Sequence, residues 1–302
     1  MRKSRPSRAL LLIATVLAPR HLWAQAAITA GRAADPNAAI RVSSLTGSLR
    51  ITTWPRDSIT VRGRVDAGTG RFYLGGVPTA LKLGIEPPDS GEPQGVADLD
   101  IVVPEGSRLW VKSSAAEIDI TAGGGSVEVT NVSGQVRVAG QASSVSVETL
   151  DGNVELAARS ALGHVRTASG TIVVRGVVND LDASTVSGRL YIGMEGAVDR
   201  VRLETVSSEI AFKGDLTREG RLEAETHGGD VELRLPVRLQ AAYHLLSYGG
   251  GVVNQLVPPS VVRRGQGKGE WSFQTGDGRA TVMVRTFKGT ITLKVRGEPP
   301  GN

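Results

Sequence analysis

Histidine and carboxylate side chains are the groups in this 302-residue chain that could perform acid–base or metal chemistry. The chain has four histidines, His21, His164, His227 and His244, and none of them has the i, i+4 spacing of a helical zinc motif. His164 and His244 occupy equivalent positions of the repeat described below, but four repeats separate them, roughly 19 Å at one strand spacing per repeat. We therefore expect surface or turn histidines, with no metal site and no cofactor.

Carboxylates are frequent at positions that we expect to face outward, among them Glu117, Asp119, Glu155, Asp230 and Glu232. Sugar-cleaving β-helices use acids of this kind, so a polysaccharide-active enzyme is one hypothesis. Most of these acids, however, are followed one repeat later by a basic residue, and a flat, neutralised face does not perturb a carboxyl pKa as a catalytic cleft does. No nucleophile elbow, P-loop or dinucleotide fingerprint occurs, and we assign no catalytic residue.

The first 26 residues predict a secretory signal peptide. A basic segment at 2–8 precedes an apolar stretch at 9–18, and Ala24-Gln25-Ala26 fits a cleavage site of small residues. The apolar stretch is too short to span a bilayer, so we expect no transmembrane segment after cleavage. The mature protein is therefore expected in the periplasm, at the cell surface or in the medium.

The net charge of +5 belongs to this leader, since its five basic residues leave 30 basic and 30 acidic residues in the mature chain. A neutral mature chain gives no reason to expect nucleic-acid binding. The sequence has no cysteine, which excludes disulfides, thiolate metal sites and cysteine nucleophiles. The remaining length suits one large all-β domain.

One phrase recurs along the mature chain: apolar-x-apolar-x-Thr-x-Ser-Gly-x-apolar-x-apolar, clearest at 127–138. We call the residue at the Gly position the anchor of each copy. From position 116 the steps between anchors are 18, 18, 18, 18, 20, 21, 21 and 39 residues. The anchors are Gly47, Ala116, Gly134, Gly152, Gly170, Gly188, Ser208, Gly229, Gly250 and Gly289. Each copy contains two runs that alternate with period two, which predicts two short half-buried strands.

Two arrangements of these strands are compatible with the repeat, a parallel β-solenoid and a meander of hairpins. Outward residues one repeat apart alternate in charge, as in Asp119, Arg137 and Glu155, and this favours stacking in register. Glu204 followed by Glu225 departs from the pattern. We predict an all-β, single-stranded parallel β-solenoid with coils of 18–21 residues, about nine or ten in number.

Two columns next to the anchors are distinctive. Three residues before the anchor is a small polar residue that we expect to point inward and to hydrogen-bond from one coil to the next. This structural ladder includes Asn131, Thr149, Thr167, Thr185, Thr205 and Thr226. Two residues before the anchor is an apolar column: Leu45, Val132, Leu150, Val186, Val206, Tyr248 and Phe287. We favour packing of this column into a corner of the coil, and the alternative is an exposed stripe that binds a partner.

The remaining segments do not follow the repeat. The basic residues Arg263, Arg264 and Lys268 could hold an anionic polymer, or they belong to a solvated loop. The irregular 66–110 region and the final strands at 281–295 are the expected caps of the stack. We expect a flexible lead-in at 27–38, an N-terminal β region and cap at 39–110 with an insertion at 66–97, repeats at 111–296 with an insertion loop at 255–270, and a tail at 297–302.

The repeat, the phrase at 99–106 and the closing segment at 286–293 together resemble the bacterial "putative adhesin" β-strand-repeat domains of unknown function, over about residues 38–295. The resemblance implies an exported or envelope-associated β-solenoid and supplies no catalytic residues. Our leading hypothesis is a non-catalytic, adhesin-like binding or structural module for an envelope glycan or protein. The alternatives are a polysaccharide-active β-helix enzyme and an envelope-stress sensory or regulatory protein.

Overall fold

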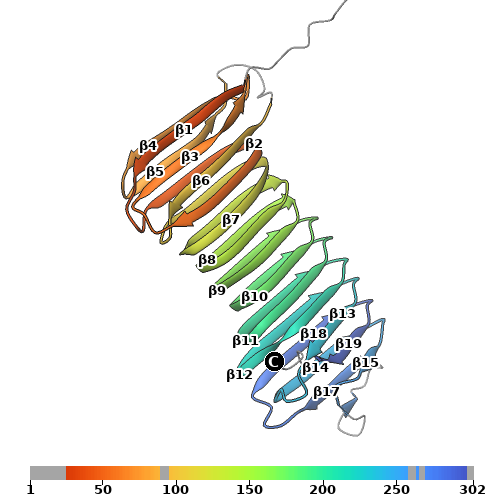
Figure 1. The fold of residues 1–302 in the computed structure, drawn as a ribbon. Coiled ribbons are helices and arrows are strands. Elements are labelled where there is room, and N and C mark those ends of the chain that lie inside the picture. The colour runs from red at the N-terminus through yellow and green to blue at the C-terminus, as the bar shows by residue number, and fades with distance from the viewer. Residues whose placement is uncertain (1–24, 89–94, 258–262, 265–268, 298–302) are drawn as a thin grey trace, which may run out of the picture.

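The computed structural model describes residues 25–88, 95–257, 263–264 and 269–297, so most of the expected signal peptide lies outside the described residues. Within the described residues every regular element is a β-strand, and 19 strands form one sheet in which most neighbours are parallel. The strands lie side by side in a long row (Figure 1). The all-β fold expected from the sequence is therefore confirmed.

The strands carry the labels of Figure 1. They are β1 (Gln25–Ala33), β2 (Ala39–Trp54), β3 (Ser58–Asp66), β4 (Arg71–Val77), β5 (Ala80–Glu86), β6 (Ala97–Pro104), β7 (Arg108–Ser133), β8 (Val136–Asp151), β9 (Val154–Thr167), β10 (Ile172–Thr185), β11 (Leu190–Thr205), β12 (Ile210–Thr226), β13 (Val231–Leu235), β14 (Ala241–Ser247), β15 (Val252–Asn254), β16 (Arg263–Arg264), β17 (Glu270–Gln274), β18 (Ala280–Thr286) and β19 (Ile291–Val295).

Neighbouring repeats in the middle of the chain pair in parallel at a nearly constant offset. Equivalent residues on β7 to β13 lie next to one another in the order Ile118, Val136, Val154, Ile172, Leu190, Ile210 and Val231. Hairpins in a meander would pair antiparallel, so the meander alternative is wrong. The predicted charge column is also in register, because Asp119 lies beside Arg137 and Arg137 beside Glu155.

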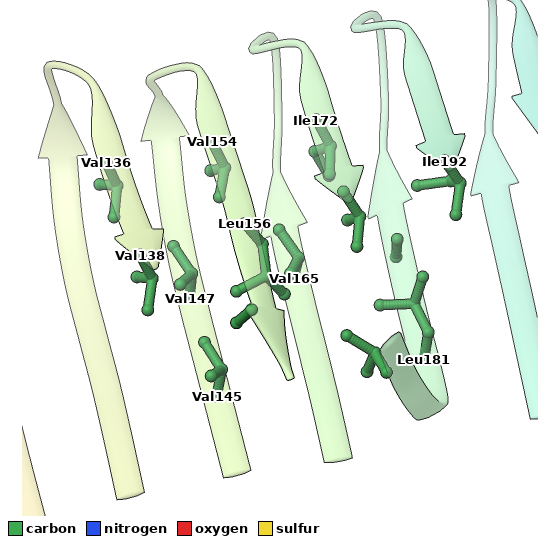
Figure 2. Packing of buried hydrophobic residues seen from close by; sticks show 14 of the residues in the cluster. Val136, Val138, Val145, Val147, Val154, Leu156, Val165, Ile172, Leu181 and Ile192 are labelled. Carbon is green, nitrogen blue, oxygen red and sulfur yellow. The ribbon is translucent and has the colours of Figure 1, made fainter. Parts of the chain in front are cut away.

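Each repeat bends at the anchor and buries alternate side chains of both runs. Val136 and Val138 follow one anchor, Val145 and Val147 precede the next, and all four are at most 1% exposed. Figure 2 shows such side chains in the space between the two runs. Burial of each side chain of this size contributes about 1.5–3 kcal/mol, which is the main stabilising contribution available to a chain without disulfides.

The polar ladder lies inside the bend, as predicted for most of its members. Asn131, Thr167, Thr185, Thr205 and Thr226 are buried, whereas Thr149 is half-buried. The hydroxyls bond to the backbone. Thr286 at the equivalent position shows the pattern best, because its Oγ1 donates to the Gly229 carbonyl oxygen at 3.0 Å and accepts from the Gly289 N–H at 3.0 Å. One hydroxyl thus connects the anchors of two neighbouring repeats.

Eight of the ten anchors are glycines, mainly because the repeats approach closely at the bend. A Cβ on Gly188 would lie 1.7 Å from the carbonyl oxygen of Gly170, and one on Gly289 would lie 1.8 Å from that of Gly229. Neither residue has a positive φ, so the lack of space, and not the backbone conformation, excludes a side chain. Gly134 differs, since its φ of 96° also favours glycine.

Strand order at the C-terminal end departs from chain order. Glu223 of β12 lies beside Met283 of β18, and Met283 lies beside His244 of β14. On the other run, β13 pairs with β19, and β19 pairs with β15. The final repeat therefore lies inside the stack, and our expectation that the final strands cap it is wrong. The chain first builds the outer repeat at 241–254 and then returns, which accounts for the long step to the last anchor.

The N-terminal end is built in the same manner. β2 lies between β7 on one side and β5 and β6 on the other. Antiparallel strands then cover the outer edges, with β3 on β6, β1 on β3 and β4 on β5, and at the opposite end β17 covers β14. Such coverage keeps a parallel stack from pairing with other chains.

Two expectations for the N-terminal region need correction. Residues 27–33 were expected to be a flexible lead-in, but they belong to β1, which pairs with β3 along its whole length. The expected insertion at 66–97 contains two strands, β4 and β5, which pair with each other, and β5 also pairs with β2. The N-terminal segments therefore form part of the sheet.

A disulfide can test the strand order, because the chain has no native cysteine. Glu223→Cys combined with Met283→Cys places two thiols on directly paired residues, about 4.8 Å apart at the backbone, so we expect an intramolecular disulfide on mild oxidation. Glu223→Cys with His244→Cys is the matched control and should stay reduced, since β18 lies between the two residues. Mass spectrometry of peptides distinguishes the pairs, and oxidation of the control alone would contradict the order.

The hydroxyl ladder makes a second prediction. Thr286→Val should lower the free energy of unfolding by about 1–3 kcal/mol, because the Gly289 N–H and the Gly229 carbonyl lose their buried partner. Thr286→Ser keeps the hydroxyl and should lose only about 0.8 kcal/mol for the missing methyl group. Urea unfolding curves measure both. A valine variant as stable as the serine variant would show that the hydrogen bonds do not matter.

Candidate functional site

The apolar column beside the anchors is exposed to solvent, so the corner packing that we favoured is wrong. Val132, Leu150, Val186 and Val206 are 50%, 60%, 54% and 50% exposed. The neighbouring ladder residue already fills the inside of the bend, which leaves the next side chain no position except outside. We call this column the edge stripe; in spatial order it comprises Leu45, Ser114, Val132, Leu150, Ala168, Val186, Val206, His227, Phe287 and Tyr248.

The edge stripe ends in three rings that are distant in the sequence. His227 stacks on Phe287 with ring centroids 4.8 Å apart and planes 7° apart. Phe287 also meets Tyr248 at 5.7 Å with a tilt of 39°. His227 was not part of the predicted apolar column, and nothing in the sequence places it beside Phe287, because that contact depends on the inserted final repeat.

A shallow groove of about 850 Å³ follows the edge stripe over its C-terminal part. We call it the edge groove. The edge stripe forms one wall, from Val186 to Tyr248, and the buried ladder lies beneath the floor. The opposite wall consists of side chains two positions earlier on the flat face of the sheet: Arg166, Ser184, Glu204, Glu225, Arg285 and Leu246.

Charges on this polar wall are mostly unpaired. Glu204 accepts hydrogen bonds from Arg202 at 2.6 and 2.7 Å, and this carboxylate raises the pKa of the Arg202 guanidinium above its ordinary value. The side chains of Arg166, Glu225 and Arg285 form no hydrogen bond or ion pair with any described residue. Glu225 even lies in register with Glu204, a like-charge neighbour that opposes stacking.

A second groove, of about 610 Å³, lies on the face formed by the runs after the anchors. Three of its seven charged side chains, Arg175, Glu232 and Arg234, are paired within the described residues. Glu155 pairs with Arg175 at 2.5 Å, and Glu232 accepts hydrogen bonds from both Lys294 and Arg234, which hold its pKa below the usual range. The edge groove is the stronger candidate site, since one of its walls consists of exposed apolar and aromatic side chains.

The other sequence-based candidates do not come together. Arg263 and Arg264 form β16 against β17, and Lys268 lies outside the described residues. Among the residues that the structure describes, no three His, Asp or Glu side chains are grouped to hold a metal ion. The same part of the chain contains no helix with the length and apolar character needed to cross a membrane.

Comparison with known proteins gives a family and two distant structures. A search of the curated proteins gives no match. A "putative cell adhesion protein" from Clostridium sporogenes ATCC 15579 is 10% identical, with a TM-score of 0.25 over 90% of this chain and 100% of that one. A "putative adhesin" from Bacteroides fragilis NCTC 9343 is 10% identical, with a TM-score of 0.36 over 89% of this chain and 97% of that one.

The family match is more informative than either structure. Residues 97–294 match the family described as Toastrack DUF4097, and this segment includes the repeats and both walls of the edge groove. The resemblance to β-strand-repeat domains noted in the sequence is thereby confirmed. The match covers well over half of the chain, and the chain therefore belongs to the Toastrack DUF4097 family.

Proposed function

We propose that this protein is an exported, non-catalytic binding module of the cell envelope that holds its partner in the edge groove. The observation that carries the proposal is the edge stripe, where successive repeats place exposed apolar or aromatic side chains along one edge. Soluble monomers rarely expose a large contiguous apolar patch unless it contacts a partner or ligand. The unpaired charges on the facing wall supply polar contacts to the same partner.

The scaffold that we propose is a single-stranded parallel β-solenoid with coils of 18–21 residues, about nine or ten in number. The parallel register at offsets of 18, 20 and 21 residues supports it. A solenoid repeats each surface position at about 4.8 Å along its axis, which suits an extended partner.

Export is part of the same proposal. The basic and apolar segments before Ala26 support a cleaved leader, and the mature chain without cysteine needs no oxidising folding step. We propose the periplasm, the cell surface or the medium as its location. The expected partner is a glycan or a protein of the cell envelope.

The stripe can be tested with paired substitutions on its exposed part. Val186→Ser with Val206→Ser should change the free energy of unfolding by less than about 0.5 kcal/mol per site, because both side chains are half exposed or more. The same variant should co-sediment with isolated cell envelopes at least about tenfold more weakly than the mature wild-type chain.

Leu162→Ser is the matched control, since Leu162 is 54% exposed but lies outside the edge stripe and the edge groove. It should co-sediment like the wild type. Equal binding by the double variant, or no binding by the wild type, would refute the proposal.

A polysaccharide-active enzyme is the second candidate, and one observation favours it. Glu204 and Glu225 are in register on neighbouring strands of the groove wall, about 4.8 Å apart at the backbone, close to the ~5–5.5 Å between the carboxyl groups of retaining glycosidases. Those enzymes, however, place one carboxyl on each side of the scissile bond, whereas the wall facing these two glutamates is apolar. The binding module is therefore the better-supported function.

An assay for released reducing ends decides between the two. We expect the mature chain to release none from a panel of soluble and envelope polysaccharides over prolonged incubation. Product that disappears in Glu225→Gln would replace the binding proposal with a hydrolase.

A further inference from the structure

We infer that the edge groove binds an uncharged, linear polysaccharide that lies along the axis of the stack. This inference rests on the proposed function and names the chemical class of its ligand. Four observations support it: the chemistry of the two walls, the zero net charge of the polar wall, the backbone amides of the floor that are already hydrogen-bonded, and the exposed ring of Tyr248.

The two walls match the two sides of a sugar ring. A pyranose has an apolar face of C–H groups and a rim of hydroxyls. The stripe wall offers side chains such as Val206 to the C–H face, and the polar wall offers Glu225 and Arg285 to the hydroxyls. A carboxylate accepts and a guanidinium donates several hydrogen bonds, and in the structure these two groups have no other described partner.

The charges of the polar wall favour an uncharged ligand. Arg166 and Arg285 contribute two positive charges, and Glu204 and Glu225 contribute two negative charges, so the wall is neutral in sum. A polyanion would lie against the two carboxylates in the middle of the wall, and a polycation would meet the two guanidinium groups that flank them. Like charges brought together in this way weaken binding, and an uncharged chain avoids both.

The floor of the groove disfavours an extended peptide. A peptide that binds as an added strand needs a free sheet edge for its backbone. Here the amides of the stripe already donate across the repeats, as from Val206 to the Val186 carbonyl at 3.2 Å and from His227 to the Val206 carbonyl at 3.1 Å. A bound helix would need a wide apolar trough, whereas each repeat supplies one apolar side chain and faces a charged wall.

The aromatic end provides one open ring face. Phe287 lies between His227, which stacks on one of its faces, and the tilted ring of Tyr248. Among the described residues Tyr248 ends the row and contacts a single ring, and it is 68% exposed. Its outer face can pack against the C–H face of a sugar, as aromatic faces pack against C–H groups elsewhere. The six repeats of the groove span roughly 24 Å at one strand spacing each, long enough for several sugar units.

Isothermal titration of the mature chain with cellohexaose and with chitohexaose, two uncharged linear hexasaccharides, tests the inference. We expect saturable binding of at least one of them and none of a heparin hexasaccharide. Tyr248→Ala should weaken the binding at least about tenfold, and Glu225→Gln at least about threefold. Leu162→Ala, an exposed change outside the groove, should leave it unchanged, and thermal unfolding should confirm that all three variants are folded.

The outcomes separate this inference from the proposed function. If neither hexasaccharide binds while envelope binding still depends on Val186 and Val206, the groove recognises something other than an uncharged glycan. This outcome overturns the inference and leaves the proposed function intact. Equal affinity of Tyr248→Ala and wild type, or tighter binding of heparin, also overturns it. If the wild type binds neither the oligosaccharides nor the cell envelopes, the proposed function is overturned as well.

Discussion

The contact between consecutive anchors determines the geometry on which the rest of the structure depends. The carbonyl oxygen of one anchor occupies the position that a Cβ of the next anchor would need, 1.7 Å away in the case of Gly170 and Gly188. The ladder hydroxyl then bonds both anchors, so the register of neighbouring repeats is set at the bend. Apolar alternation alone would leave the strands free to shift by two residues, and this contact removes that freedom.

The same constraint creates the edge stripe. Because the ladder side chain points inward, the next residue along the strand must point outward whatever its type. The fold accepts Ser114 and His227 at this position, so apolar character is not needed for folding there. Exposed Val, Leu, Phe and Tyr side chains invite unwanted association. Their presence over most of the column is therefore better explained by binding than by stability.

Sequence reasoning recovered what the repeat itself encodes, namely parallel stacking from 116 to 208, the inward Thr column and the alternating charges. It could not recover the order of the last repeats, since the copies at 241–254 and 280–295 carry the same phrase and either could follow β12 and β13. The row of His227, Phe287 and Tyr248 depends on that order, so it was missed for the same reason. Strict period-two alternation places Val132 and its equivalents outside, where the structure has them. Our preference for corner packing was wrong because it assumed that the bend of the strand would turn these side chains into a corner.

The interleaved ends also determine when the candidate site can exist. The rings at the end of the edge groove come from the turns after β12, β18 and β14, and the middle ring belongs to the last repeat of the chain. Until that repeat is inserted, His227 and Tyr248 have no common neighbour and Arg285 is absent from the polar wall. The aromatic part of the groove is thus complete only after the final segment has folded between two strands made before it. A ligand that bridges these rings would bind the finished stack more tightly than any partly folded form, and it would stabilise the end that is built last.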